Sequence, residues 1–355
     1  MDDRTEKTML GILSSVAPGS LLRMGLDRVL EAGRGGLIVI GDGPEVLEIC
    51  SGGFLVDAPF SPQKLSELSK MDGAIILDSA VSKISRANVH LLPDSTVSTS
   101  ETGTRHRTAE RVARSLKVPV VAVSESRSDI HVYLEDLVHS LLSDSRLLER
   151  SNQAIQTLER YRLRLDTVSK NLSLLEVEDL VSLRDVLEVI QRAEMVIRIS
   201  NEIKRNLIEL GTSGRLIRFQ LEELMVGVTD DRRLLLRDYL NVDSMSLAEA
   251  MDKLTELDDE ELFDDSALAS SLKLSKTPVD IDELMTPKGF RILNKLPRIH
   301  EALVERLVDE YGSLNRIIRA DTDELANVHG VGEARAQALK QGTMRLVENS
   351  FFDRF

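Results

Sequence analysis

Short apolar runs alternate with longer amphipathic stretches over the first 145 residues of the chain. The amphipathic stretches predict helices from Ser20 to Ala32 and from Pro62 to Lys70. The apolar runs predict buried strands, and they are Gly36–Ile40, Ala74–Leu77, Ile84–Leu92, Val118–Val123 and Ile130–Leu134. Strands that alternate with helices indicate an α/β domain, with a central mixed sheet flanked by helices.

A further amphipathic helix is predicted over 109–116, and the nine residues before it form its N-terminal end. Gly103 allows a close backbone turn there, and we expect Thr102 or Thr104 to cap the helix. Two arginines, Arg105 and Arg107, crowd onto this end. The N-terminus of a helix already carries partial positive charge and favours acidic side chains. Added cations therefore predict a bound phosphate, unless both arginines simply extend into solvent.

Beyond residue 145 the pattern is helical and divides into two parts. Residues 146–285 are predicted to form a helical spacer or oligomerisation module, in which we find no chemistry. It carries a short heptad seam, the start of a capped helix at Ser182 and Asp185, and a break at Gly211 and Gly214. The seam consists of Leu158, Tyr161, Leu165, Val168 and Leu172.

Residues 286–355 are predicted to form a third unit of short helices. The segment Val328–Gly332 joins two of them through a tight turn, and its two glycines leave backbone N–H groups open to a phosphate. This resembles the helix-hairpin-helix motif, which binds the sugar-phosphate backbone of DNA. The candidate DNA contacts are His329, Gly330, Gly332, Arg335 and Lys340. A second hairpin at 296–299 lacks glycines and is predicted to be structural; an inert turn is the alternative for the first.

Composition and charge limit the function. Aromatic residues make up 3% of the 355 residues and Trp is absent, which argues against a base-stacking platform. The single cysteine, Cys50, excludes an internal disulfide, and we expect it to be buried in a protein of the reducing cytoplasm. The net charge of −14 lies mainly in residues 151–285, with 17 Lys and Arg against 28 Asp and Glu. The net charge therefore does not exclude DNA binding by residues 286–355, which contain 11 Lys and Arg against 10 Asp and Glu.

Two loops beside the predicted strands carry further candidate chemistry. Asp72 precedes the second strand within an Asp-Gly turn, and its carboxylate suits Mg²⁺ or Mn²⁺ on a triphosphate, or a proton from an attacking hydroxyl. Ser124 and Arg127 follow the fourth strand, where ligands of open α/β sheets bind. The alternatives are an ordinary turn and a polar loop. His106 is either a ligand contact or structural, and His90 is taken as structural.

Asp72-Gly73-Ala74 together with Gly103-Thr104-Arg105-His106-Arg107-Thr108 resembles the two signature motifs of the diadenylate cyclases. With its helical middle and its helix-hairpin-helix end, the chain resembles the DisA proteins, the DNA integrity scanning family, over essentially its full length. Longer stretches that match the family are 68–75, 87–91 and 101–111.

This resemblance implies the condensation of two ATP molecules into cyclic di-AMP and two pyrophosphates, with Mg²⁺ or Mn²⁺. It implies a homo-octamer with facing cyclase domains, inhibited by branched DNA of the Holliday-junction type. Glu125 departs from a basic residue that some members have there. By position, the resemblance assigns Asp72, Gly73 and Ala74 to the ribose and α-phosphate, Leu91 to the adenine, and Gly103, Thr104, Arg105, His106, Arg107, Thr108, Ser124 and Arg127 to the phosphates.

The chemistry of such a reaction independently requires two facing sites. Each 3′-hydroxyl must attack the α-phosphorus of the other nucleotide in line, which one site holding one ATP cannot arrange. Catalysis then consists mainly of positioning and charge neutralisation, with Asp72, Arg105, His106 and Arg107 as the candidate catalytic residues. The alternatives are a branched-DNA-binding protein whose first domain only senses nucleotide, and a helical scaffold without ligands.

Overall fold

The computed structural model describes residues 3–125, 129–241, 243–275, 279–297 and 299–352. The chain divides into two compact units: residues 1–154 with 202–220, and residues 155–201 with 221–355. The helices α6 and α7 each contribute residues to both units. In the described part of the chain, no helix combines the length and the apolar content that crossing a membrane requires.

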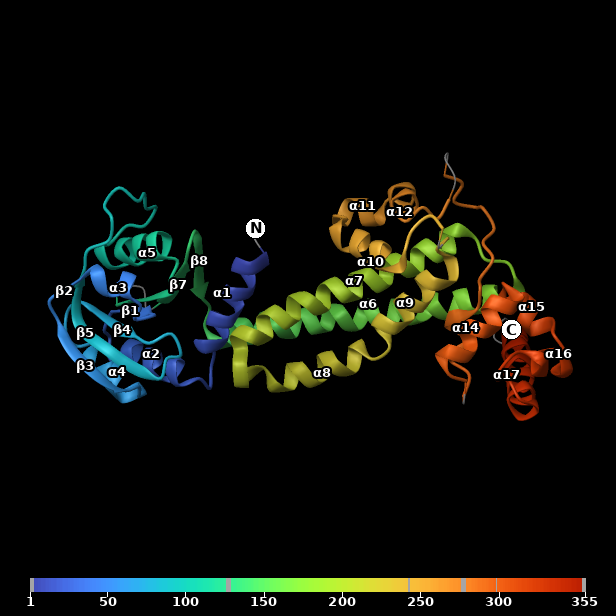
Figure 1. Ribbon diagram of the computed structural model, residues 1–355, viewed down its shortest axis with the longest axis horizontal. Coiled ribbons are helices and arrows are strands. Elements are labelled where there is room, and N and C mark those ends of the chain that lie inside the picture. The colour runs from blue at the N-terminus through green and yellow to red at the C-terminus, as the bar shows by residue number, and fades with distance from the viewer. Residues whose placement is uncertain (1–2, 126–128, 242, 276–278, 298, 353–355) are drawn as a thin grey trace. The chain divides into compact units, whose positions relative to one another are not determined.

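A mixed sheet of eight strands forms the centre of the first unit (Figure 1). The strand order is β2-β5-β4-β1-β6-β7-β8, and β3 pairs with β5. Among the described strands, the pairing of β1 with β4 is the only parallel one, and the other pairings are antiparallel. The strands are β1 (Gly36–Ile40), β2 (Cys50–Ser51), β3 (Phe54–Pro59), β4 (Ala74–Leu77), β5 (Lys83–Leu91), β6 (Val120–Ser124), β7 (Asp129–Leu134) and β8 (Leu137–Leu141).

Helices cover both faces of this sheet, as the apolar pattern predicts. Along β1, Ile38 and Ile40 join a core with α1 (Asp3–Ser15), α2 (Leu21–Glu31) and α4 (Pro62–Leu68). The alternate residues Leu37 and Val39 join a second core with α3 (Pro44–Glu48) and α5 (Thr104–Leu116). Because successive side chains point to opposite faces of a sheet, one strand serves both layers. The predicted fold class is confirmed.

The strands that were not predicted are short or exposed. β3 contains six residues, none of them buried, so it shows none of the apolar alternation by which a half-buried strand is recognised. β2 has two residues and β8 has one buried residue out of five. Cys50 lies in β2 and is half-buried rather than fully buried, and burial raises the pKa of its thiol.

The secondary structure of the second unit consists of helices, apart from one isolated β-bridge between Ser182 and Leu284 among its described residues. The predicted heptad seam is largely buried: Leu158, Leu165, Val168 and Leu172 are at most 6% exposed. The remaining helices of the chain are α6 (Asp144–Glu178), α7 (Leu183–Leu210), the 3-10 turn Gly211–Gly214, α8 (Arg215–Met225), α9 (Val228–Tyr239), α10 (Leu247–Glu256), α11 (Asp259–Phe263), α12 (Asp265–Ser271), α13 (Phe290–Leu293), α14 (Glu301–Tyr311), α15 (Leu314–Arg319), α16 (Thr322–Asn327) and α17 (Glu333–Phe352).

A buried ion pair joins α13 to α6 within this second unit. The guanidinium of Arg291 donates to the carboxylate of Glu176, and both side chains are at most 1% exposed. Tyr239 donates its hydroxyl to the same carboxylate at 2.8 Å. Asp238 accepts the backbone N–H groups of Gly289 and of the first two residues of α13 at 2.6–2.9 Å. Buried polar groups therefore fix the start of the C-terminal helices on α6 and α9.

Candidate nucleotide site and nucleic-acid hairpin

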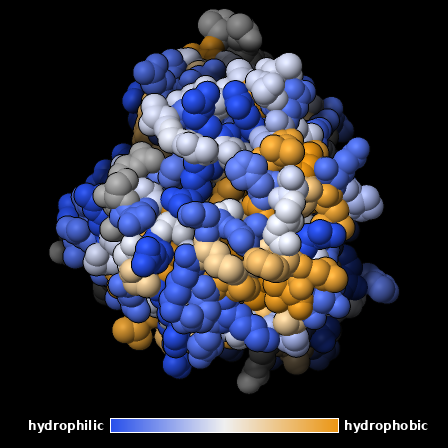
Figure 2. Space-filling view, turned by 90° about the vertical axis from the view of Figure 1, so that its left-hand side faces the viewer, coloured by the Kyte–Doolittle hydropathy of each residue, from blue (hydrophilic) through white to orange (hydrophobic). Residues whose placement is uncertain are grey.

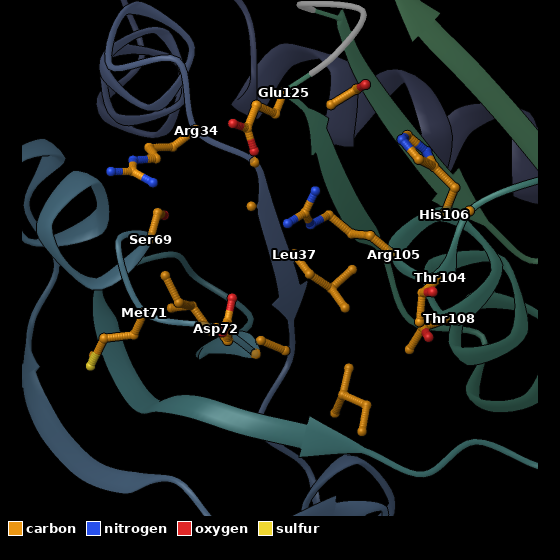
Figure 3. A pocket seen from close by; sticks show the side chains of 18 of the residues that line it. Arg34, Leu37, Ser69, Met71, Asp72, Thr104, Arg105, His106, Thr108 and Glu125 are labelled. Atoms are coloured by element: carbon orange, nitrogen blue, oxygen red, sulfur yellow. The ribbon is translucent and has the colours of Figure 1, made fainter.

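A cavity of about 990 Å³ opens in the first unit beside the N-terminus of α5 (Figure 3). Segments that are far apart in the chain meet around it, because β1, β4, β5 and β6 are neighbours in the sheet. The volume is that of a pocket for a molecule the size of a nucleotide. The cavity is lined by residues 34–37, 69–75, 89–91, 102–106, 108, 124 and 125.

The Asp-Gly turn before β4 places a carboxylate in this cavity. Gly73 has φ +99°, and a Cβ there would lie 2.8 Å from the carbonyl oxygen of Val89. Only glycine fits this combination of positive φ and close backbone approach. The turn therefore packs against β5, and the neighbouring Asp72 lines the cavity with an exposed side chain.

The N-terminus of α5 borders the opposite side of the cavity. Its N-cap is Gly103, with φ +122° and no side-chain hydrogen bond to the first turn. The expectation that Thr102 or Thr104 caps the helix was therefore wrong: Thr104 is already the first helical residue. Because glycine has no side chain to cap the first turn, an anion can be accommodated there.

The two arginines of this helix lie in different environments. Arg105 lines the cavity, and in Figure 3 its guanidinium extends toward the middle of the lining residues. Gly35 makes room for it, since a Cβ there would lie 2.1 Å from Arg105 Nη1. Arg107 is exposed and is not among the lining residues. Residues two apart on a helix do not face the same direction. Of the two arginines Arg105 therefore lines the cavity, and the phosphate contact expected of Arg107 stays a prediction.

The loop before α5 is held by a buried carboxylate. Glu110 is 1% exposed and accepts hydrogen bonds from the side chains of Thr99 and Ser100 and from two backbone N–H groups. Burial acts to raise the pKa of Glu110, but these hydrogen bonds and the nearby Arg114 outweigh it and lower the pKa. Because the ionised carboxylate anchors the loop, the loop holds its position beside the cavity.

His106 is buried at the edge of the cavity and belongs to a polar network. Its Nδ1 lies 2.8 Å from the hydroxyl of Tyr133, which donates to Glu101 at 2.9 Å. His131 packs edge-on against the His106 ring, with the centroids 5.2 Å apart. The interpretation of His106 as a ligand contact is supported by its place in the cavity lining, and the structural interpretation by its hydrogen bond to Tyr133.

The other predicted contacts are mostly brought together in the cavity. Gly73, Ala74, Leu91, Gly103, Thr104, Thr108 and Ser124 all line it, as does the divergent Glu125. Arg127 lies outside the described residues. Sequence reasoning missed Arg34, which lines the cavity from the loop before β1. The glycine-rich stretch 33–36 around this arginine was the available signal. His90, taken as structural, is exposed and lines the cavity too.

The C-terminal hairpin lies between α16 and α17 in the second unit. Gly330 has φ +85°, and a Cβ there would lie 2.5 Å from a guanidinium nitrogen of Arg306. This arginine, which sequence reasoning missed, also lies 3.3 Å from Nδ1 of His329. A Cβ at Gly332 would meet no atom within 4 Å. The carbonyl oxygen of Gly332 accepts the backbone N–H groups of Arg335 and Ala336 in the first turn of α17.

Two predicted DNA contacts already have partners inside the protein. Arg335 donates to the carbonyl of Gly330 at 2.9 Å, which supports the turn. Lys340 donates to the carbonyls of Ile318 and Ala320 at 2.9 and 2.7 Å, at the C-terminal end of α15. The ammonium of Lys340 thus caps the C-terminal end of α15. The other predicted DNA contacts, His329, Gly330 and Gly332, form the turn of the hairpin. In the second hairpin at 296–299, Leu296 and Ile299 are buried, which supports a structural role, and Arg298 lies outside the described residues.

Three family models match the chain in the order that this architecture suggests. Residues 23–137 match the DisA bacterial checkpoint controller nucleotide-binding family, and residues 141–279 match the DisA linker region. Residues 290–342 match the SAM-like helix-hairpin-helix tandem.

Curated relatives match over the whole chain. The DNA integrity scanning protein DisA of Kineococcus radiotolerans is 48% identical over 358 residues, covering 100% of both chains. That of Streptomyces griseus is 47% identical, covering 99% of this chain and 95% of its own. The chain belongs to the DisA family. Among solved structures, DacA from Staphylococcus aureus matches 40% of this chain and 91% of its own at 24% identity, with a TM-score of 0.29.

Membership of the DisA family gives the two sites their general roles. The chain is a diadenylate cyclase, with a nucleotide-binding domain that contains the cavity. Its helix-hairpin-helix tandem is the DNA-binding part. The division at residues 145 and 285 stays a prediction.

Proposed function

We propose that this DisA-family protein condenses two ATP molecules into cyclic di-AMP and two pyrophosphates. The observation that carries the proposal is the cavity of about 990 Å³, in which Asp72 lies on one side and the uncapped N-terminus of α5, with Arg105, on the other. Backbone N–H groups, threonine hydroxyls and a guanidinium suit the triphosphate. Arg34 and Lys70 add positive charge to the same lining.

Each residue has a proposed task in this reaction. Asp72, Gly73 and Ala74 lie beside the ribose and α-phosphate, and Leu91 lies beside the adenine. Thr104, Arg105 and Thr108 hold the phosphates with Ser124, and His106 contributes through its backbone N–H in the first turn of α5. Arg107 is exposed on the outer side of α5, so we assign it to the phosphates of the nucleotide on the facing copy.

A divalent cation fits this site. An exposed carboxylate next to a triphosphate is the oxygen-rich environment that Mg²⁺ and Mn²⁺ prefer, and Asp72 would hold the ion. When bound, the ion neutralises charge on the phosphates. Asp72 is also positioned to accept the proton of the 3′-hydroxyl, a task that water can share.

The reaction requires that two copies face each other, and the first unit has an apolar surface available for contacts. Figure 2 shows the side of the molecule that lies on the left in Figure 1, and apolar side chains gather on one part of it. On the first unit, Phe54 and Leu55 of β3 are 60% and 73% exposed. Large exposed apolar patches mark interaction sites. We propose self-association to the homo-octamer, measurable by light scattering.

Incubation of the purified chain with ATP and Mn²⁺ tests the cyclase proposal. We expect a cyclic dinucleotide peak on chromatography and two pyrophosphates for each product molecule. ATP binding without any product would instead support the alternative, in which the first domain only senses nucleotide. Absence of ATP binding would exclude both.

We further propose that the hairpin around Gly332 binds the DNA backbone, with branched DNA as its ligand. A Cβ at Gly332 meets no atom within 4 Å, so the fold tolerates a side chain there. Gly332→Asp places a carboxylate where the phosphate would bind, and aspartate is also a good N-cap. We expect at least tenfold weaker junction binding by Gly332→Asp than by the matched control Gly332→Ala. Equal affinities would contradict this assignment.

DNA bound at the hairpin is proposed to inhibit synthesis. α6 and α7 belong in part to both units, so they are the candidate route of coupling. Synthesis rates measured with and without a saturating four-way junction test this regulation. An unchanged rate would mean that the two activities are independent.

A further inference from the structure

A cluster of two histidines and one aspartate lies behind the first turn of α5. Asp129 and His131 are two apart on β7, so both point to the same face of the sheet. His106 approaches them from α5, which packs on that face. The metal-ligand atoms of the three residues all lie within 4.8 Å of one another.

The spacing of this cluster suits a small coordination sphere. His131 Nδ1 lies 3.6 Å from Asp129 Oδ1. Metal–ligand bonds of about 2.0–2.2 Å in tetrahedral geometry separate neighbouring ligand atoms by roughly 3.3–3.6 Å. The observed distance is therefore close to that of two ligands on one ion, and it is longer than a hydrogen bond.

The hydrogen bonds around His106 determine its tautomer. Tyr133 donates its hydroxyl hydrogen to Glu101, so its oxygen accepts from Nδ1–H of His106. The neutral imidazole then carries its lone pair on Nε2, the form that ligates a metal. Metal-binding histidines characteristically donate their other ring N–H to such an outer partner. Tyr133 and Glu101 thus supply the outer shell of a metal site.

We propose that His106, Asp129 and His131 bind a divalent transition-metal ion. Two imidazoles and one carboxylate favour Zn²⁺ or Co²⁺ over Mg²⁺ and Ca²⁺, which prefer oxygen ligands. The side chains of His131 and Asp129 are 13% and 28% exposed, so an ion can reach them. This site is separate from the one assigned to Asp72 and does not depend on the proposed cyclase reaction.

The ion would tie α5 to β7 at the edge of the cavity. His106 lies next to Arg105, and Asp129 pairs in the sheet with Ser124; both of these neighbours line the cavity. The bound ion therefore positions the phosphate-binding end of α5, and it also stabilises the folded first unit through linkage.

Metal binding is measured without nucleotide on the full chain, after dialysis against a chelator. We expect one Co²⁺ or Zn²⁺ for each chain, with a visible Co²⁺ spectrum of low coordination number and a rise in melting temperature. His131→Asn and Asp129→Asn are each expected to weaken Co²⁺ binding at least tenfold. Asp72→Asn is the matched control and should bind Co²⁺ as the wild type does.

Three results would overturn the proposal. The first is wild-type protein that binds no Co²⁺ or Zn²⁺ at micromolar concentrations, which needs no variant and is independent of folding defects. The second is undiminished binding by both His131→Asn and Asp129→Asn. Loss of binding in the Asp72→Asn control would place the ion at the nucleotide site, and would equally contradict the separate site. Cyclase activity enters none of these measurements.

Discussion

Asp72→Asn is expected to lower the rate of cyclic di-AMP synthesis by roughly 10²–10⁴-fold while ATP still binds. Asparagine has nearly the same shape as aspartate but lacks its charge, so it neither accepts a proton nor neutralises a cation. Asp72 is exposed in the cavity, so the fold does not depend on its charge. Chromatography of the product and calorimetric titration with ATP measure the two effects separately.

The matched control for this experiment is Asp57→Asn. Asp57 is an exposed aspartate of β3, outside the cavity, with φ +47°. Asparagine tolerates that left-handed conformation, so the change removes one carboxylate from the same domain without backbone strain. We expect turnover close to that of the wild type. Wild-type turnover by Asp72→Asn would exclude Asp72 from the reaction.

Arg291→Ala is expected to destabilise the second unit by about 3–5 kcal/mol. The change leaves the Glu176 carboxylate buried, with no cation in place of the guanidinium. Removing one partner of a buried pair costs far more than removing both. The double variant Arg291→Met with Glu176→Gln should therefore recover most of the lost stability. Urea unfolding followed by circular dichroism measures these differences.

An exposed ion pair in the same unit provides the control for Arg291. Arg184 contacts Asp282 at 3.1 Å, with side-chain exposures of 54% and 75%. Exposed pairs contribute at most about 1 kcal/mol because water screens them, so Arg184→Ala should have a small effect. If Arg291→Ala is no more destabilising than Arg184→Ala, the buried pair does not hold α13 in place.

The buried strands could be predicted from the sequence because burial on both faces leaves a distinct apolar run. The predicted bounds of β1 and β4 agree with the structure. β3 could not be found in this way, since its residues are exposed or half-buried and its place depends on pairing with β5. That pairing is a tertiary contact, which local pattern does not contain.

The candidate site was only partly predictable for a similar reason. Asp72 and the residues around Thr104 stand out as local motifs, but Arg34 enters the cavity because β1 lies next to β4 and β6. Helical periodicity already separates Arg107 from Arg105 in the sequence, whereas the phosphate contact expected of Arg107 stays a prediction. The hydrogen bonds of Lys340 to the end of α15 depend on tertiary packing and left no signal in the sequence.

Because α5 lacks a side-chain cap, a bound nucleotide is expected to stabilise the domain that binds it. Other helices of the chain, such as α2, α4 and α10, are each completed by a serine hydroxyl, whereas α5 begins at a bare glycine. A phosphate that takes this place finishes the turn and so favours the folded domain by mass action. Without nucleotide, the protein would be less stable and more susceptible to proteolysis near the N-terminus of α5, which borders the cavity.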